Sequence, residues 1–178
     1  MLFKIIKAGI MKKVLFVFSF VFVLTGCKKE ETACQFSAGS SVAPANEKSM
    51  VTSYLSTNNI SNAVELGNSG MYYVIDVAGS GNKPGQCSFL NVKYIGKYQD
   101  GTVFDQTSGS NTAAFTLGQL IEGWKRGVPL IGAGGKIRLY IPPTLGYGPA
   151  GVFNSSTGNY TIPPNAMLIF EVELVSIS

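Results

Sequence analysis

The stretch Leu168-Ile169-Phe170-Glu171-Val172-Glu173-Leu174 indicates the fold more clearly than any other part of the sequence. Large apolar residues occupy positions 168, 170, 172 and 174, and glutamates stand between them at 171 and 173. This alternation is typical of a β-strand with one buried and one solvent-facing side. Residues 136–141 and 89–95 repeat the pattern, and Tyr94 falls on the apolar side of the second. The sequence therefore predicts several half-buried strands and places Tyr94 toward the core.

Between these strands and before them, the sequence consists mainly of turn residues and short apolar runs. Asn68-Ser69-Gly70 predicts a turn, and residues 71–77, which are rich in aromatic and β-branched side chains, predict a further strand. Within this region, only residues 123–130 have the pattern of a short helix. We therefore expect an α+β fold in which antiparallel strands fold over that one helix.

Before the β-rich region, the sequence predicts one helix and a tether. Apolar residues recur at helical spacing over 47–58, namely Met50, Val51, Tyr54 and Leu55, and Asn58-Asn59 follows as a stop. We expect a short amphipathic helix whose role is packing. Residues 27–46 are mostly charged at the start and then rich in Ser, Ala and Gly, which predicts a flexible tether.

Residues 1–26 have the anatomy of a secretory leader. Lys12 and Lys13 precede the apolar run 14–24, which is too short to span a bilayer as a stable helix. The run closes on Leu24-Thr25-Gly26-Cys27, which resembles a bacterial lipobox. The resemblance implies cleavage before Cys27 and acylation of this residue, with several chains giving stable anchoring. It implies a lipid-anchored cell-envelope protein, at the outer membrane on its periplasmic or surface-exposed side. An ordinary secretory signal with a chance cysteine is the alternative, and translation from Met1 and from Met11 both stay open.

The net charge of +4 resides in the leader. Beyond residue 26 the chain carries ten Lys and Arg against ten Asp and Glu, so this part is formally neutral. A neutral chain without a basic stripe argues against nucleic acid as a partner. The run Lys28-Lys29-Glu30-Glu31 is either a solvated part of the tether or, by resemblance, one of the short charged signals that send lipoproteins to the cell surface.

The residue types in the chain also limit the reactions that it can catalyse and the cofactors that it can bind. The chain contains no histidine, so a serine, threonine or cysteine nucleophile lacks its usual base and a zinc or haem site lacks its usual ligand. No glycine loop of the phosphate-binding type occurs either. We therefore expect no metal and no cofactor. Cys34 and Cys87 belong to a compartment where thiols are often oxidised, and a disulfide between them stays open at this point.

Four motifs carry the functional information. They are Asp100-Gly-Thr-Val-Phe-Asp105, Leu117-Gly-Gln-Leu-Ile-Glu-Gly-Trp124, Ile141-Pro-Pro-Thr-Leu-Gly-Tyr-Gly148 and the run Ile162-Pro-Pro-Asn-Ala-Met-Leu-Ile-Phe-Glu-Val-Glu-Leu174. Together, and in this order, they resemble an FKBP-type peptidyl-prolyl cis/trans isomerase domain extending over about 71–177. The resemblance implies a curved antiparallel β-sheet wrapped around one short α-helix, with a proline-binding pocket between them. It implies rotation of X-Pro bonds in exported proteins. We divide the chain into 1–26 (signal peptide), 27–46 (tether), 47–70 (helix and turn) and 71–178 (isomerase domain).

The resemblance also implies roles for individual residues. It assigns the pocket floor to Trp124 and the walls to Tyr94, Phe104 and Phe170. The rim consists of Leu120 and Ile121, with the Ile121 amide as a donor, the polar mouth of Asp105 and Tyr147, and the side of Ile162. Phe115 is a further expected substrate-binding residue. Asp105, Tyr147 and Phe104 are the expected catalytic residues. Asp105 either holds Tyr147, faces the carbonyl carbon of the twisted amide, or caps the turn after Phe104. Taken singly, each of these aromatic residues is more typical of a core than of a site.

Two departures from the family pattern bear on activity. Ala113-Ala114 stands where an aromatic residue usually precedes Phe115, which thins one wall. The loop 148–161 is longer than in a minimal domain and polar, with Phe153 and Tyr160 as its large residues, and we expect substrate choice to reside there. A catalytically weak proline-peptide-binding or chaperone module and a purely structural envelope lipoprotein are the alternatives. Expected partners are proline-containing polypeptides, a macrolide ligand, and the membrane through the lipid anchor.

Overall fold

The computed structural model describes residues 33–178, and the predicted signal peptide, Cys27 and residues 28–32 lie outside this range. The helices are α1 (Ala45–Thr57) and α2 (Glu122–Gly127), with short 3-10 turns at Leu117–Gln119, Val128–Leu130 and Pro143–Leu145. The strands are β1 (Val64–Glu65), β2 (Tyr72–Val77), β3 (Phe89–Lys97), β4 (Val103–Gln106), β5 (Ala113–Thr116), β6 (Gly135–Ile141), β7 (Val152–Asn154), β8 (Asn159–Ile162) and β9 (Leu168–Ile177). No helix within the described range is long and apolar enough to cross a membrane.

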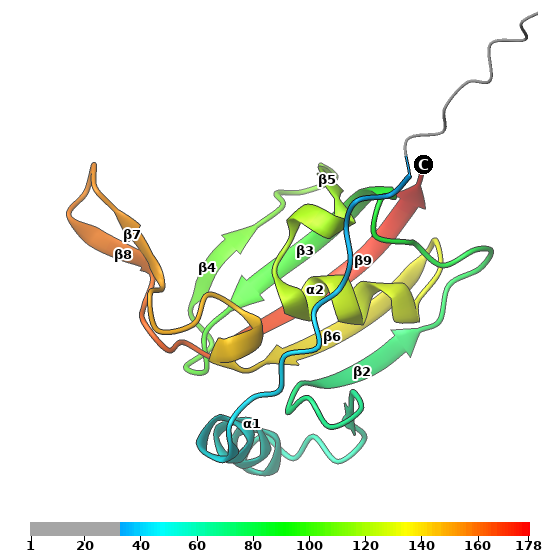
Figure 1. Cartoon of the computed structure of the whole chain (residues 1–178). Helices are drawn as coiled ribbons and strands as arrows, with labels where there is room; N and C mark the ends of the chain where they lie inside the picture. Colours follow the sequence, from blue (N-terminus) through cyan, green and yellow to red (C-terminus); the bar gives the residue numbers. More distant parts are fainter. Residues whose placement is uncertain (1–32) are drawn as a thin grey trace, which may run out of the picture. The chain divides into compact units, whose positions relative to one another are not determined.

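Seven strands form one antiparallel sheet in the order β1-β2-β6-β9-β3-β4, with β5 also paired to β3 (Figure 1). The alternating stretch at the C-terminus is the central strand β9, which lies between β6 and β3. Its register places Phe170 opposite Leu139 on one side and Gly96 on the other. The predicted strands 71–77, 89–95, 136–141 and 168–174 all correspond to strands of this sheet, and the predicted α+β class is confirmed.

Helix α2 packs on one face of the curved sheet (Figure 1), as the sequence predicted for residues 123–130. Two glycines allow the close approach. A Cβ atom on Gly123 would lie 2.4 Å from Cδ1 of Ile141, and one on Gly127 would lie 2.6 Å from Cδ2 of Leu139. Because interiors are packed to crystal-like density, neither side chain of β6 has room to retreat far. The helix can therefore approach β6 this closely only because these two positions carry no side chain.

Helix α1 packs against a second group of buried side chains. Val51 and Leu55, two of the apolar residues that predicted this helix, are buried together with Tyr140, Met167 and Ile169. Tyr140 and Ile169 alternate along their strands with core residues that face α2, so α1 covers the opposite face of the sheet. The packing role predicted for this helix is what the structure shows.

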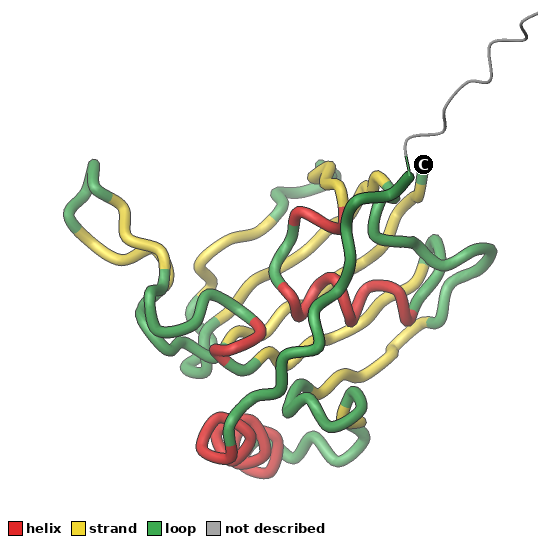
Figure 2. The backbone as a smooth tube through the Cα atoms, in the orientation of Figure 1, coloured by secondary structure: helices red, strands yellow, loops and turns green. Residues whose placement is uncertain are grey.

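Residues 33–44 of the predicted tether follow a loop path across α2 (Figure 2), whereas its last two residues, 45 and 46, already belong to α1. We call this segment the strap. A disulfide joins Cys34 to Cys87, the Gly39 amide donates to Oε2 of Glu122 over 2.6 Å, and Arg126 donates to the Ser41 carbonyl over 2.8 Å. The composition of the strap predicted flexibility because it offers little apolar surface. A covalent bond and backbone hydrogen bonds attach it instead.

The long loop after Gly148 contains a hairpin rather than irregular structure. Strands β7 and β8 pair with each other and project away from the large sheet (Figures 1 and 2). The turn is closed by Asn154, whose Oδ1 accepts a hydrogen bond from the Ser156 amide over 3.0 Å, and by Gly158 at a φ of 70°. Only glycine adopts that conformation without steric cost. The apolar alternation of a half-buried strand is missing here because neither face of the hairpin covers the core.

Candidate active site

A pocket of about 260 Å³ opens between α2 and the sheet. Its walls come from strands β3, β4, β5 and β9, from helix α2 and the turn before it, and from the loop after β6. The residues that line it are Tyr94, Phe104, Asp105, Phe115, Gln119, Leu120, Ile121, Trp124, Tyr147 and Phe170. All the catalytic and substrate-binding residues predicted from the sequence, except Ile162, therefore meet in one cavity, although they are spread over most of the domain's length.

Aromatic rings form the inner part of the pocket. Trp124 is only 4% exposed, and its indole meets the rings of Tyr94 and Phe170 edge to face at centroid distances of 5.6 and 5.3 Å. Phe115 meets the same indole at 6.2 Å. Edge-to-face contacts of this kind are favourable beyond the area they bury and hold the rings in fixed orientations. The pocket is therefore apolar at its base and shaped in advance.

Phe104 extends the aromatic wall toward the mouth. Its ring meets Phe170 at 5.6 Å, nearly perpendicular, and packs on Tyr98 at 4.9 Å. Gly96 on β3 makes this position accessible, because a Cβ atom there would lie 2.6 Å from Cζ of Phe104. Any larger residue at position 96 would displace the Phe104 ring from the wall.

Asp105 is the one charged residue of the pocket lining. Its Oδ2 accepts a hydrogen bond of 2.5 Å from the Tyr94 hydroxyl group. Of the three roles that the sequence left open for Asp105, a hydrogen bond to Tyr147 is not found among the described residues. In the strand register Asp105 pairs with Gly96, which places its side chain diagonal to Tyr94 on the same face of the sheet. Burial, and next the hydrogen bond to this carboxylate, raise the pKa of Tyr94 above its ordinary value.

Tyr147 lies at the mouth of the pocket and is 41% exposed. Partial burial raises the pKa of its hydroxyl, and the negative charge of Asp105 raises it further. Both effects favour the neutral phenol, so at physiological pH the mouth presents a hydroxyl group that can donate a hydrogen bond.

The rim precedes helix α2. The Ile121 carbonyl accepts hydrogen bonds from the amides of Trp124 and Lys125, at 3.0 and 3.1 Å, and so fixes the start of the helix. The Ile121 amide itself makes no hydrogen bond to any other described residue, which leaves it free to donate to a ligand. Gln119 also lines the pocket and was not predicted. It could have been predicted from its place directly before Leu120 in the motif 117–124.

Ile162 is the predicted site residue that the pocket lining does not include. It is 4% exposed and packs in the main core, paired with Val152 at the base of the hairpin. Ala113 and Ala114 lie in β5 opposite Val92 and Asn91, so the wall at this side consists of Phe115 alone.

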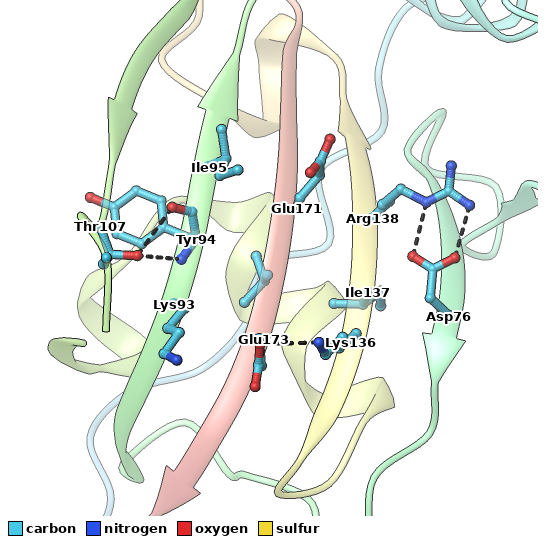
Figure 3. A pocket seen from close by; sticks show the side chains of 12 residues that line it. Asp76, Lys93, Tyr94, Ile95, Thr107, Lys136, Ile137, Arg138, Glu171 and Glu173 are labelled. Atoms are coloured by element: carbon cyan, nitrogen blue, oxygen red, sulfur yellow. Dashed lines mark hydrogen bonds and ion pairs between the residues drawn. The ribbon is translucent and has the colours of Figure 1, made fainter. Parts of the chain in front are cut away.

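A second hollow, of about 350 Å³, lies over strands β3, β9, β6 and β2 on the sheet (Figure 3). Four of its six charged side chains are paired across strands, Arg138 with Asp76 at 2.8 Å and Lys136 with Glu173 at 3.2 Å, as Figure 3 shows. Glu171 pairs instead with Lys97, outside the hollow, and Lys93 forms no ion pair within the described residues. A prolyl ring gains less from this surface than from the aromatic pocket, because half of the twelve residues that line it are charged. The aromatic pocket is therefore the candidate active site.

An antiparallel sheet around one short helix, with an aromatic cavity between them, defines an α+β binding domain for a compact apolar group. Residues 81–175 match the model of the FKBP-type peptidyl-prolyl cis-trans isomerase family. This match covers more than half of the chain, and the chain belongs to that family. Residues 11–27 match the prokaryotic membrane lipoprotein lipid attachment site, which ends on Cys27.

Similar proteins agree with this assignment. The chain is 37% identical over 125 residues to the FKBP-type peptidyl-prolyl cis-trans isomerase FkpA of Aeromonas hydrophila, an alignment that covers 70% of this chain and 44% of the relative. It is also 37% identical over 125 residues to the outer membrane protein MIP of Legionella longbeachae, covering 70% and 51%. The chain thus spans about half the length of the curated relatives it matches, or less.

Solved structures confirm the fold. The crystal structure of FkpA from Escherichia coli aligns with a TM-score of 0.63 at 33% identity, over 75% of this chain and 60% of that one. A peptidyl-prolyl cis-trans isomerase from Pseudomonas syringae aligns with a TM-score of 0.61 at 27% identity, over 79% of this chain and 99% of that one. The predicted curved sheet around a short helix is confirmed.

Proposed function

We propose that this chain is a peptidyl-prolyl cis/trans isomerase that binds a prolyl residue in the aromatic pocket and accelerates rotation about the preceding amide bond. The observation that carries the proposal is the cavity itself, a cage of aromatic rings around Trp124 with one carboxylate and one phenol at its mouth. Its size and apolar base suit a pyrrolidine ring. Its polar groups lie where a peptide backbone would pass.

Rotation needs no bond to be broken, so the absence of histidine is no obstacle. The barrier is about 18–20 kcal/mol because resonance gives the C–N bond partial double-bond character. Resonance also makes the planar amide more polar than the twisted one. Moving the amide from water into an apolar pocket therefore destabilises the planar state more than the transition state, and only such differential binding raises the rate.

Polar groups at the rim and mouth would fix the substrate around the twisting bond. We infer that the Ile121 amide, which makes no hydrogen bond to a described residue, donates to a carbonyl oxygen of the bound peptide, and that the Tyr147 hydroxyl is a second donor. Asp105 uses Oδ2 for Tyr94, so its other oxygen is left to face the electron-poor carbonyl carbon of the twisted amide. In this proposal Phe104, Asp105 and Tyr147 act on the amide, and the remaining lining residues hold the ring.

The substrates in this proposal are exported polypeptides whose folding waits on slow X-Pro isomerisation. The lipid attachment site at residues 11–27 supports anchoring through acylated Cys27 in the bacterial cell envelope. We place the domain at the outer membrane, and the charged run after Cys27 allows either the periplasmic or the surface-exposed side. A macrolide that mimics the prolyl ring is a further ligand of the same pocket.

The deciding experiment is a cis-to-trans assay with a proline tetrapeptide, using the full chain purified in detergent micelles. Acceleration above the uncatalysed rate supports the proposal. If peptide binding changes the fluorescence of the single tryptophan, Trp124, but the rate stays at the uncatalysed value, the chain is instead a proline-peptide-binding module with a pocket thinned at Ala113-Ala114. The absence of both signals refutes any role in proline recognition.

A further inference from the structure

The hairpin of β7 and β8 displays two large aromatic side chains to solvent. Phe153 is 55% exposed and Tyr160 is 48% exposed, and their rings meet at a centroid distance of 5.2 Å with an interplanar angle of 70°. Each ring therefore contacts the other and keeps about half of its residue's surface open to solvent. Paired exposed aromatic rings, unlike scattered single ones, form a surface that another apolar group can bind.

The hairpin is attached to the same loop that carries Tyr147. The Gly151 amide donates to the Tyr147 carbonyl over 3.2 Å, directly before the hairpin begins. In the ladder, Val152 pairs with the buried residue Ile162, and Phe153 and Tyr160 form the next pair outward. The aromatic pair thus lies one ladder step from a residue fixed in the core, on an element that continues from the mouth of the pocket.

A second connection runs through the pocket wall. The Tyr98 hydroxyl donates to the carbonyl of Thr161, which lies between Tyr160 and Ile162 in β8. The ring of Tyr98 packs at 4.9 Å on Phe104, a wall residue of the pocket. These two contacts fix the base of the hairpin, and with it the aromatic pair, at a set position relative to the pocket.

Charge indicates what this surface can bind. Residues 139–170, which include Tyr147 and the whole hairpin, contain no charged side chain, and Asp105 is the single charge of the pocket lining. Such a surface has no attraction for nucleic acid or other polyanions. It favours apolar side chains, and in a polypeptide these are accessible chiefly before folding, since folded domains bury them.

We propose that Phe153 and Tyr160 bind an apolar side chain of the same polypeptide whose prolyl residue occupies the pocket. The inference rests on the proposed function and deepens it, because it names the substrate class as unfolded chains that carry an apolar residue a short distance from proline. The hairpin then selects by affinity, whereas the pocket performs the rotation. A tetrapeptide is too short to reach both.

The test compares two substrates on the full chain in detergent micelles. One is the proline tetrapeptide, and the other is a set of longer proline peptides with one leucine moved outward from the proline on either side. The leucine peptide with the highest kcat/KM for the wild type is then used for the double variant Phe153→Ala/Tyr160→Ala. We expect its kcat/KM to fall about fivefold through a higher KM, because an aromatic contact contributes about 1 kcal/mol. The tetrapeptide rate stays unchanged. Phe89→Ala removes another aromatic ring, 45% exposed, at the far end of β3, and leaves both rates unchanged.

Three outcomes would overturn the inference. An unchanged KM for every leucine peptide means that the pair contributes no binding. An equal loss on both substrates means that the hairpin acts only by shaping the pocket. A change of sedimentation from a dimer to a monomer means that a second copy of the chain occupies the surface. If the wild type accelerates neither substrate, the proposed function fails, and Trp124 fluorescence titrations with the same peptides still decide whether the hairpin contributes to binding.

Discussion

The Tyr94 hydroxyl group donates a hydrogen bond of 2.5 Å to Asp105, and this pair connects the deep aromatic part of the pocket with its polar mouth. The Tyr94 ring packs on Trp124 at the base, while its hydroxyl group reaches the carboxylate at the opening. The bond fixes the rotamers of both residues. The carboxylate is also exposed to solvent, so the charge lies beside the apolar cavity without being buried in it.

The charge of Asp105 is expected to matter for turnover more than for folding. In Asp105→Asn the side-chain oxygen can still accept from Tyr94, but the negative charge near the twisting carbonyl carbon is lost. We expect kcat/KM in the tetrapeptide assay to fall about tenfold, equivalent to about 1.4 kcal/mol of transition-state stabilisation. Asp100→Asn is the matched control, because Asp100 is exposed and its amide replacement keeps the hydrogen bond from the Thr102 amide. Equal rates for the two variants would remove Asp105 from the mechanism.

Tyrosine ionisation is expected to weaken the fold at alkaline pH. The pKa values of Tyr94 and Tyr147 are raised in the folded state, in both cases mainly by burial. In the unfolded chain tyrosine titrates near pH 10. The stabilisation from keeping these phenols neutral is complete below about pH 10 and is lost as the pH rises toward the folded-state values, since the native state then holds more protons than the unfolded one.

Urea unfolding at a series of pH values measures this effect. The free energy of unfolding is expected to fall above about pH 10, and Tyr94→Phe is expected to make the fall shallower, because it removes one of the phenols that ionise on unfolding. Tyr160→Phe serves as the control, since Tyr160 lies half exposed on the hairpin. An identical slope in the wild type and in Tyr94→Phe would contradict the assignment.

The main strands could be predicted from the sequence because each buries only one side. β3, β6 and β9 are long enough for their alternation to show, whereas β1 has two residues and β4 and β5 have four each, too few to establish a period. The hairpin gave no such pattern because it covers no core. The attachment of the strap depends on the pairing of Cys34 with Cys87 and on hydrogen bonds from its backbone, and residue composition reports neither.

The pocket residues could be grouped only through the family motifs. Taken alone, Phe104 and Trp124 are residues typical of a hydrophobic core, and no helical or strand periodicity relates one to the other. The partner of Asp105 was missed for a different reason: it depends on the register of β3 and β4, which shifts at Gly96/Lys97. A register irregularity is a property of the paired strands, so neither strand's sequence reveals it.

The packing of α2 on the sheet is expected to depend on the glycines of this helix. Gly123→Ala places a methyl group 2.4 Å from Ile141, which must move. We expect a loss of about 2 kcal/mol in the free energy of unfolding, typical of overpacking, and weaker peptide binding because Trp124 follows directly in the helix. Gly85→Ala is the control, because a Cβ atom there meets nothing within 4 Å. Unfolding curves that coincide for the two variants would show that the helix adapts.

The strap is expected to contribute to stability through its disulfide. The bond between Cys34 and Cys87 closes a loop across a sequence separation of 53 residues, and chain entropy predicts about 4 kcal/mol of stabilisation from such a closure. Cys34→Ser should therefore lower the unfolding temperature under non-reducing conditions, and a reductant should lower that of the wild type to the same value. Because the strap also accepts from Arg126 and donates to Glu122, its release should loosen the helix that carries Trp124, visible as a change in indole fluorescence before global unfolding. A wild type whose unfolding temperature does not respond to reductant would mean that the hydrogen bonds hold the strap without the covalent bond.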